Sequence, residues 1–324
     1  MSQVGDAATA DPTTVYGVEA AVVGKTPWQL FWGRFKQDKM AFFGLGFIGF
    51  LVLIALFAPV VANVVGHGPN ELFQREMTDA FGLPRGPNSE FYFGADKAGR
   101  DLFVRVMYGA RTSLTVAVIS TTFSVLIGVT LGIIAGYFGG KVDTIISRGI
   151  DIVLSMPLLL FAIGIVAACS TTKEGCLGGW IKPGLSVVIF VIALFSWPYI
   201  ARIVRGNTLS IREKEFIEAS RSLGATNRSI MFREVLPNLV APIIVYATLI
   251  IPNNILFEAA LSFLGLGVDQ KTPSWGRMLS DASQVFDVAW WLMFFPGLFL
   301  FFTTLAFNLF GDGLRDALDP RTGR

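Results

Sequence analysis

Few residues in this chain are of types that could do chemistry, and they do not cluster. The two cysteines, Cys169 and Cys176, enclose a turn-forming stretch that includes Thr-Thr-Lys-Glu-Gly. On the oxidising side of a membrane such a pair can form a disulfide, and the alternative is two unpaired thiols. The single histidine, His67, stands alone and is interpreted as incidental rather than as a metal ligand. These residues predict no metal site.

A phosphate-binding loop, which would allow the chain to hydrolyse ATP, is also missing from the sequence. The pairs Gly24-Lys25 and Gly140-Lys141 lack the upstream glycine that a GxxxxGK[ST] loop requires. The apolar segments hold no nucleophile or metal cluster of the kind that a membrane-embedded enzyme needs. We therefore expect a chain that is not an enzyme and that uses no cofactor.

Glu258 is the one carboxylate deep within an otherwise apolar stretch. A charged group at such a depth is costly and usually faces a cavity or a partner rather than lipid. One interpretation places Glu258 on a solute pathway, where it would meet an amine of the solute. The other gives it a hydrogen bond to a neighbouring helix, or a position near the outer boundary of the membrane. The sequence leaves both interpretations open.

The elements that must position these residues are membrane-spanning helices. Hydrophobic residues make up 53% of the chain and charged residues 15%, with a mean hydropathy of +0.59. Soluble domains typically have about 25% charged residues, and a net charge of +2 is too small to indicate a nucleic-acid partner. The sequence predicts an all-α integral membrane protein, since six segments are apolar enough to cross a bilayer, which takes about 20 residues. They are Ala41–Ala62, Ser113–Phe138, Ile152–Ala168 (which is short and contains Pro157), Gly184–Ala201, Leu239–Leu264 and Ala289–Phe310.

An even number of spans places both termini on one side of the membrane. With the termini inside, the inner segments carry 16 of the 26 Lys and Arg residues, which favours cytoplasmic termini. Residues 1–26 contain no apolar signal sequence and are expected to form a disordered cytoplasmic tail, with a second tail at 312–324. The outer segment 64–111 balances six acidic residues against six basic ones, which indicates a folded segment.

Residues 27–40 are predicted to form an amphipathic helix before the first span. Trp28, Phe31, Trp32 and Phe35 follow helical spacing and make an aromatic edge. Such a helix lies in the headgroup region of the bilayer with this edge in lipid. The alternative is that these are the aromatic and basic residues commonly found beside membrane spans, with no separate helix.

The second span carries a ridge of small residues, one at every fourth position. Small residues allow another helix backbone to approach closely, which is how helices associate within a membrane. The ridge is expected to seat a neighbouring helix, either of this chain or of a partner subunit. Its members are Ser120, Ser124, Gly128, Gly132 and Gly136.

Segment 206–237 is a charged, helix-forming stretch between the fourth and fifth spans. Ser210 followed by Glu213 has the pattern of a capping box, which predicts a helix from Ile211. The helical spacing places four residues on one face of this helix: Phe216, Ala219, Ser220 and Leu223.

A turn is expected to end this helix and a second helix to follow it. Gly224 is suited to the left-handed conformation of a C-terminal cap. Thr226 or Asn227 would cap the second helix, which leads to Pro237 and the next span. The result is a pair of short helices across one end of the bundle. The alternative is a solvated loop.

The second half of this segment carries a recognisable pattern: Glu218-Ala219-Ser220, three residues, Gly224, nine residues, then Glu234-Val235-Leu236-Pro237. The pattern resembles the "EAA" signature of importer-type ABC permeases. It departs from the general form at Ser220, where a second alanine is usual, and at Glu234, where an isoleucine is usual.

Other blocks are similar to the second, C-type permease subunit of dipeptide, oligopeptide and nickel importers. Four blocks occur in the expected order and cover roughly residues 28–321. They are Phe93–Asp101 with Tyr108–Arg111, the signature above, Glu258–Gly267 with Thr272–Gly276, and Gly311–Asp316 with Leu318–Pro320.

The resemblance implies a six-span permease domain over 41–311 in a bacterial or archaeal plasma membrane. It implies three kinds of partner in addition to lipid: a second homologous permease, two cytoplasmic ATPases and an extracytoplasmic binding protein. ATPase coupling would fall to Glu215, Glu218, Ala219, Ser220, Gly224 and Ala225. The substrate stays open among dipeptides, oligopeptides, nickel chelates and oligosaccharides, and a self-sufficient, ion-coupled secondary transporter is the alternative function.

Overall fold

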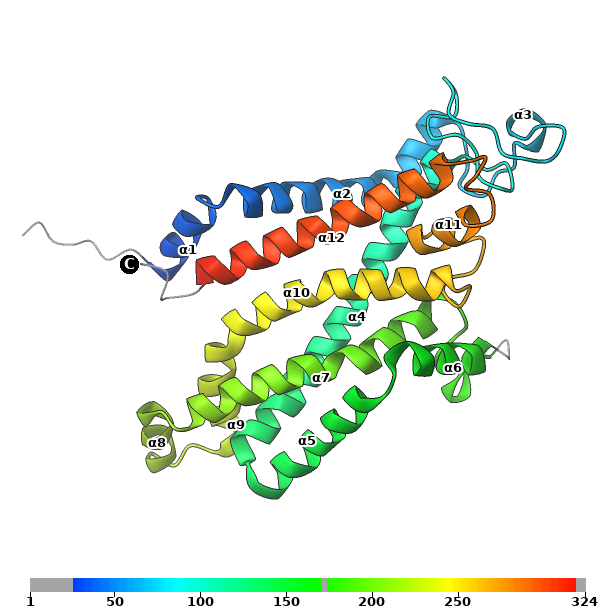
Figure 1. Cartoon of the computed structure of the whole chain (residues 1–324). Helices are drawn as coiled ribbons and strands as arrows, with labels where there is room; N and C mark the ends of the chain where they lie inside the picture. Colours follow the sequence, from blue (N-terminus) through cyan, green and yellow to red (C-terminus); the bar gives the residue numbers. More distant parts are fainter. Residues whose placement is uncertain (1–25, 171–173, 319–324) are drawn as a thin grey trace, which may run out of the picture.

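The protein is a bundle of long helices, shown by a computed structural model that describes residues 26–170 and 174–318 (Figure 1). Within these ranges there are isolated β-bridges and no strand, so the all-α prediction is confirmed. The long helices are α2 (Lys39–Val65), α4 (Leu102–Phe138), α5 (Gly140–Ser155), α6 (Leu158–Ser170), α7 (Leu185–Arg212), α10 (Leu236–Phe263) and α12 (Trp291–Leu318). The short elements are α1 (Pro27–Phe35), α3 (Gln74–Met77), η2 (Leu177–Gly179), α8 (Glu215–Ser222), α9 (Asn227–Ile230), the π-helical turn η3 (Met231–Val235) and α11 (Trp275–Ala282).

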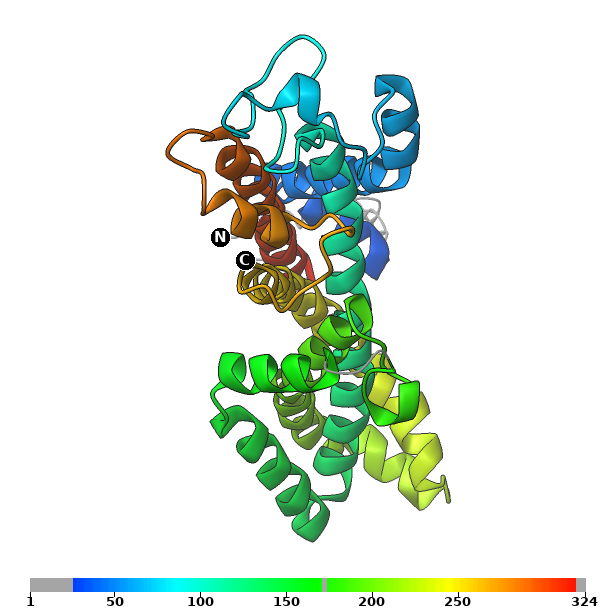
Figure 2. The same ribbon diagram turned by 90° about the vertical axis from the view of Figure 1, so that its right-hand side faces the viewer.

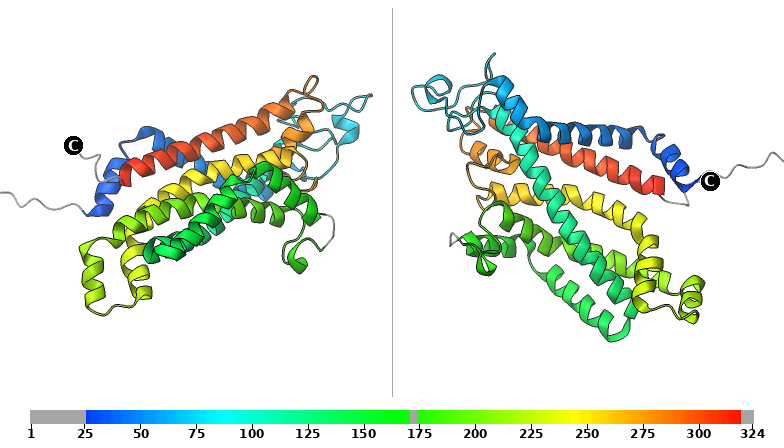
Figure 3. Two further views of the ribbon diagram at one scale, coloured as in Figure 1. Left: turned by 60° about the horizontal axis from the view of Figure 1, so that its bottom comes forward. Right: turned by 180° about the vertical axis from the view of Figure 1, so that it is seen from behind.

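Helix α4 runs obliquely through the bundle and joins its two halves (Figures 1 and 3). At one end it packs against α2, and towards the other end against α7, while α10 lies between α12 and α7. Seen from the end that carries α3, α2 and α12 lie on one side and α5 and α7 on the other (Figure 2). The helices α8, α9 and α1 gather at the opposite end, together with the end of α12 (Figure 1).

Five of these helices are each long and apolar enough to span a membrane, and a sixth span requires the pair α5 and α6. The expected third span, 152–168, is not one helix, since α5 and α6 are bent by 86° where they meet. Pro157 explains the break, because proline lacks an N–H and forces the residue before it into extended backbone. Met156 has the extended backbone (ψ of 134°) that this requires.

Ion pairs hold α5 along α7 despite the bend beyond it. The Arg202 guanidinium lies 2.9 Å from an Asp151 carboxylate oxygen. Arg205 Nη2 donates to Asp143 Oδ2 at 2.7 Å, and its Nε donates to the same carboxylate. The two pairs fix the start and the end of α5 against successive turns of α7.

Three segments that the sequence assigns to loops or tails are helical. Residues 102–111 of the outer segment begin α4, residues 206–212 of segment 206–237 end α7, and residues 312–318 of the second tail end α12. Each of these helical ends has a buried face: Val106, Thr208 and Leu314 have little or no exposure to solvent. Tertiary packing therefore extends each helix beyond its apolar membrane stretch.

The ridge of small residues on α4 seats α7 of the same chain. Its five members, 120, 124, 128, 132 and 136, are all buried. A Cβ atom built on Gly128 would lie 2.8 Å from the Trp197 carbonyl oxygen, and one on Gly132 would lie 2.7 Å from that of Ala201. Ser124 Oγ reaches the Ala193 carbonyl oxygen at 3.3 Å. The contacts on α7 also step by four residues, so the two helices meet along matching ridges.

The outer segment between α2 and α4 is folded, as its balanced charge predicts. Asp101 caps α4 by accepting hydrogen bonds from the Phe103 and Val104 amides at 2.8 and 3.2 Å. Its other carboxylate oxygen lies 2.6 Å from His67 Nδ1. The His67 ring is buried and stacks on Phe91, with ring centroids 4.5 Å apart. His67 is therefore part of the packing of this segment.

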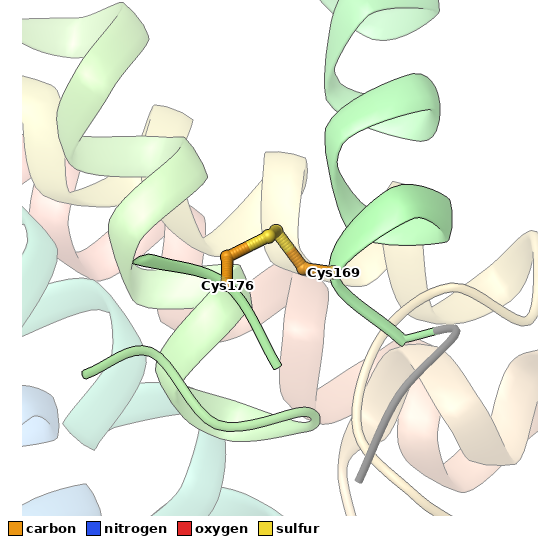
Figure 4. Close-up of a disulfide and its surroundings, with 2 residues drawn as sticks. All are labelled: Cys169 and Cys176. Carbon is orange, nitrogen blue, oxygen red and sulfur yellow. A yellow bond between two sulfur atoms is a disulfide. The ribbon is translucent and has the colours of Figure 1, made fainter. Parts of the chain in front are cut away.

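A disulfide closes the loop that follows α6. Cys169 and Cys176 are joined, with their Cα atoms 4.9 Å apart (Figure 4). Of the two alternatives left by the sequence, the structure contains the bridge. Beyond it, the Cys176 amide donates to the Ile181 carbonyl oxygen at 2.9 Å, and the chain then enters α7 at the same end of the bundle as the outer segment (Figure 1).

The helix expected at 27–40 ends at Phe35 and is followed by a turn. Thr26 and Gln29 form a capping box at its start, with bonds of 3.3 and 3.0 Å. The Phe35 ring is buried and packs edge-on against Phe310 of α12, with centroids 5.9 Å apart. Part of the expected lipid-facing edge therefore packs on the protein. Residues 1–25 of the expected tail 1–26 lie outside the described residues.

The ridge on α4 generates a stability prediction. Gly132→Ala places a methyl group against the Ala201 backbone, and we expect a loss of about 1–3 kcal/mol from overpacking. Gly46→Ala is the matched control, since Gly46 is an exposed helical glycine with no neighbouring atom within 4 Å of a built Cβ. The control should be neutral or gain up to about 1 kcal/mol from helix propensity. Thermal unfolding of the purified protein in detergent would measure both, and equal stability of the two variants would contradict the close packing.

Candidate functional site

The coupling element, residues 213–235, comprises α8, α9 and η3 at one end of the bundle (Figure 1). The prediction that a capping box at Ser210 starts its first helix is wrong. Ser210 lies inside α7, which continues to Arg212, and α8 begins at Glu215 after Lys214, which makes no side-chain capping bond. The α7 helix continues because Thr208 and Ile211 still pack against its neighbours.

The turn within the element forms as the sequence predicts. Gly224 has a φ of +81°, in the left-handed region that favours glycine. The Ala225 amide donates to the Ser220 carbonyl oxygen at 3.1 Å, which gives a carbonyl group near the end of α8 a hydrogen-bond partner. Thr226 is the residue that caps α9, its Oγ1 accepting from the Ser229 amide at 3.3 Å.

Apolar contacts anchor the element to the membrane-spanning helices. Ile217, Ile230 and Val235 are buried in one cluster with Ile200 and Val204 of α7. This cluster fixes α8, α9 and η3 to the same helix that the small-residue ridge of α4 holds.

Two polar contacts add to this anchor. The Tyr137 hydroxyl, near the end of α4, donates to Asn227 Oδ1 at 2.9 Å. Arg212 Nη1 donates to the carbonyl oxygens of Gly136 and Tyr137 at 3.3 and 3.4 Å. The element is therefore attached to α4 and α7 together.

The opposite face of α8 is exposed and uncovered. Phe216 is 41% exposed and Leu223 89% exposed, and Ala219 between them is exposed as well. Glu215 and Glu218 flank this face, and neither carboxylate takes part in an ion pair within the described residues. An apolar strip with acidic edges is suited to docking against another protein.

A cavity of about 780 Å³ lies between α6, α7 and α10. Its walls are mostly aliphatic and aromatic, and none of its lining residues is charged. The polar groups in the lining are those of Ser196, Tyr199, Tyr246, Asn253 and Asn254.

A polar chain of three residues, two of which line this cavity, joins three helices. Ser196 Oγ donates to Asn254 Oδ1 at 2.8 Å, and Asn254 Nδ2 donates to Thr121 Oγ1 at 2.8 Å. These bonds link α7, α10 and α4. Asn254 thus holds the helices together, whereas Tyr199 and Tyr246 make no side-chain hydrogen bond within the described residues.

Glu258 does not line this cavity. Its side chain is 0% exposed. Its carboxylate accepts from Ser113 Oγ of α4 at 3.0 Å and from Ser262 Oγ of α10 at 2.7 Å. The structure therefore favours the second interpretation, a hydrogen bond to a neighbouring helix, over a position on the pathway of a solute.

The structure places the residues expected to couple to an ATPase side by side, and it contains a cavity that the sequence did not predict. Glu215, Glu218, Ala219, Ser220, Gly224 and Ala225 lie together on α8 and its turn. The cavity residues were not predicted, because they come from three helices far apart in the sequence. Tyr199, Tyr246 and Asn253 within apolar spans are the signal that could have indicated them.

Two family models match this chain. Residues 128–324 match the binding-protein-dependent transport system inner membrane component. Residues 26–79 match the N-terminal TM domain of oligopeptide transport permease C. The first match contains the whole coupling element and every lining residue of the cavity.

Curated relatives cover nearly the whole chain. The dipeptide transport system permease protein DppC of Alkalihalophilus pseudofirmus is 42% identical over 91% of this chain and 90% of its own length. The glutathione transport system permease protein GsiD of Pectobacterium atrosepticum is 39% identical over 92% of each. The di/tripeptide transport system permease protein DppC of Pseudomonas aeruginosa is 39% identical over 99% of this chain and 98% of its own.

Among solved structures, an inward-facing conformation of the MetNI methionine ABC transporter has a similar fold. The TM-score is 0.55 at 20% sequence identity, over 67% of this chain and 98% of that one. At this identity the likeness concerns the fold.

The buried carboxylate generates a second prediction. Glu258→Leu leaves the Ser113 and Ser262 hydroxyls without their acceptor, and we expect a loss of about 1–3 kcal/mol. Glu258→Gln keeps an acceptor oxygen and should lose much less. Thermal unfolding of the two purified variants would compare them. A Glu258→Leu protein that unfolds normally yet fails to transport would contradict the structural role.

Proposed function

Since the chain belongs to the family of binding-protein-dependent transport system inner membrane components, and is thus a permease subunit of an ABC importer, we propose that its substrates are peptides of two or three residues. The observation that carries this proposal is the similarity of nearly the whole chain to permeases named for dipeptides, di- and tripeptides, and glutathione. Among the substrates that the sequence left open, these relatives favour short peptides over nickel chelates and oligosaccharides.

The alternative of a self-sufficient, ion-coupled transporter is wrong. The family is one of importer subunits, and the fold is that of an ABC transporter membrane subunit. The charge-free cavity is in keeping with this result, because an ion-coupled carrier would normally place paired ionisable groups there.

We propose that the exposed face of α8 docks on a cytoplasmic ATPase. The face is apolar with acidic edges, and the turn at Gly224 presents it beyond the bundle. Its other face carries the buried Ile217, which shares one apolar cluster with Ile230 of α9, Val235 of η3 and residues of α4 and α7. A push on Phe216 and Leu223 would therefore move α4 and α7 as a unit, rather than bending a loose loop.

Docking of α8 on an ATPase would also determine the remaining partners and the orientation of the chain in the membrane. A second permease would complete the pathway, two ATPases would supply the energy, and a binding protein would deliver peptides to the outer-segment end. The coupling element, α1 and the end of α12 would then face the cytoplasm. Their common location at one end of the bundle supports this arrangement (Figure 3).

The cavity is proposed to be this chain's half of the pathway. A peptide carries a charge at each terminus, and the lining offers neutral hydroxyl and amide groups, including those of Tyr199, Tyr246 and Asn253. Neutral groups can hydrogen bond to a peptide backbone without holding either terminus by a strong ion pair. Such a lining suits passage rather than tight binding.

The docking proposal predicts that Ala219→Asp uncouples ATP hydrolysis from uptake. A new charge in the centre of the apolar strip would have to be desolvated on docking, so peptide uptake should fall at least tenfold while assembly in the membrane is retained. Thr144→Asp, an exposed position near the start of α5 at the same end of the bundle, is the control and should transport normally. Unimpaired uptake by an assembled Ala219→Asp complex would count against this docking surface.

The substrate proposal is tested by uptake in cells that lack their own peptide importers. The chain, expressed with its second permease, ATPases and binding protein, should support accumulation of labelled di- and tripeptides. Uptake should disappear when the ATPases are omitted. Transport of nickel chelates or oligosaccharides in place of peptides would overturn the substrate assignment and leave the permease role intact.

A further inference from the structure

A second cavity, of about 590 Å³, lies on a different face of the bundle from the pathway cavity. It is a groove between α4 and the segment that runs from α9 through η3 into α10. Its walls are hydrocarbon, with Val129 and Ile133 of α4 facing Leu236 and Ile243. We call this surface the α4–α10 groove.

The rims of the groove are apolar and uncovered. Phe232 is 66% exposed, and Leu126, Val240 and Ile244 are exposed as well. In a membrane-spanning bundle such a surface is covered by lipid or by another protein. No side chain of residues 26–170 and 174–318 fills it.

One end of the groove carries a single cation. Arg228, in α9, is the one charged residue in its lining. Arg228 is exposed and takes part in no ion pair within the described residues. The residue before it, Asn227, is held by the Tyr137 hydroxyl at 2.9 Å, so the start of α9 is fixed to the end of α4.

We propose that the α4–α10 groove binds one anionic phospholipid, with an acyl chain along the groove and the phosphate on Arg228. A ligand with a hydrocarbon chain and an anionic head complements both features, and basic pockets between membrane helices bind such headgroups. The dimensions also agree. The α4 wall from Val125 to Ile134 is about 13 Å long at the helical rise per residue, close to the depth of one leaflet, about half of a ~30 Å hydrocarbon core.

A helix of the second permease is the rival occupant. It would cover the apolar walls, but it would leave the exposed Arg228 at the end of the groove without an anionic partner. Charge complementarity therefore favours the phospholipid.

The position of the groove gives the lipid a means of affecting transport. One of its walls includes Met231 and Phe232 of η3, the π-helical turn that joins the coupling element to α10. Turns of this kind are often found at functional sites. A bound acyl chain would pack against the link through which movement of α8 reaches α10.

The test uses the assembled importer in bilayers of phosphatidylcholine with phosphatidylglycerol. Native mass spectrometry after extraction counts the phosphatidylglycerol molecules that stay bound. Arg228→Gln should weaken retention about fivefold, as expected for roughly 1 kcal/mol from one cation near anionic lipid. Arg233→Gln is the matched control, an exposed arginine in the adjacent turn that does not line the groove, and it should retain lipid as the unmodified protein does.

A second variant fills the groove without changing its charge. Ile244→Trp should also release phosphatidylglycerol and leave phosphatidylcholine retention unaltered. Equal losses in Arg228→Gln and Arg233→Gln would overturn the proposal, since they would indicate general electrostatic attraction. A photoreactive group at Leu126 should form adducts with lipid, and adducts with the second permease would overturn the proposal as well.

Discussion

Close approach of α4 and α7 is the interaction on which the rest of the structure depends. Small residues at every fourth position of α4 bring its backbone against the carbonyl oxygens of α7, as the 2.7 Å separation built at Gly132 shows. No larger side chain fits along this line. The pair then supports both ends of the molecule: ion pairs on α7 hold α5, and Ile200 and Val204 of α7 hold the coupling element.

This arrangement explains how a short surface element can act on a distant cavity. The α8 helix is too short to be stable alone, and its order comes from Ile217, which is buried against α4 and α7. The same α7 supplies Ser196 to the polar chain that reaches Asn254 and Thr121. The α8 helix is therefore connected to helices that are linked by packing at one end and by hydrogen bonds beside the cavity.

Local patterns in the sequence predicted those features of the fold that depend on a few neighbouring residues. The ridge on α4, the turn at Gly224 and the cap at Thr226 each depend on a few neighbouring residues, and each forms as expected. The end of α7 and the partners of Glu258 did not follow from local patterns. Tertiary packing outweighs a capping box at Ser210, and Ser113, which donates to Glu258 from another helix, lies 145 residues away from it in the chain. The 86° bend at Pro157 lies between these cases, since proline predicts a break but does not set its angle.

The burial of Glu258 away from the cavity has a consequence for selectivity. With that carboxylate committed to Ser113 and Ser262, no lining residue of the cavity carries a charge. A site that discriminates strongly among polar solutes needs buried groups that are left unpaired by the wrong one, and this cavity holds few. A permease with such a cavity is expected to discriminate little among the peptides that reach it. Discrimination among peptides would then fall to the protein that delivers them. Under the proposed docking of α8, the constraint on the permease would be mechanical: α4 and α7 would have to stay in contact while the exposed face of α8 is pushed and released.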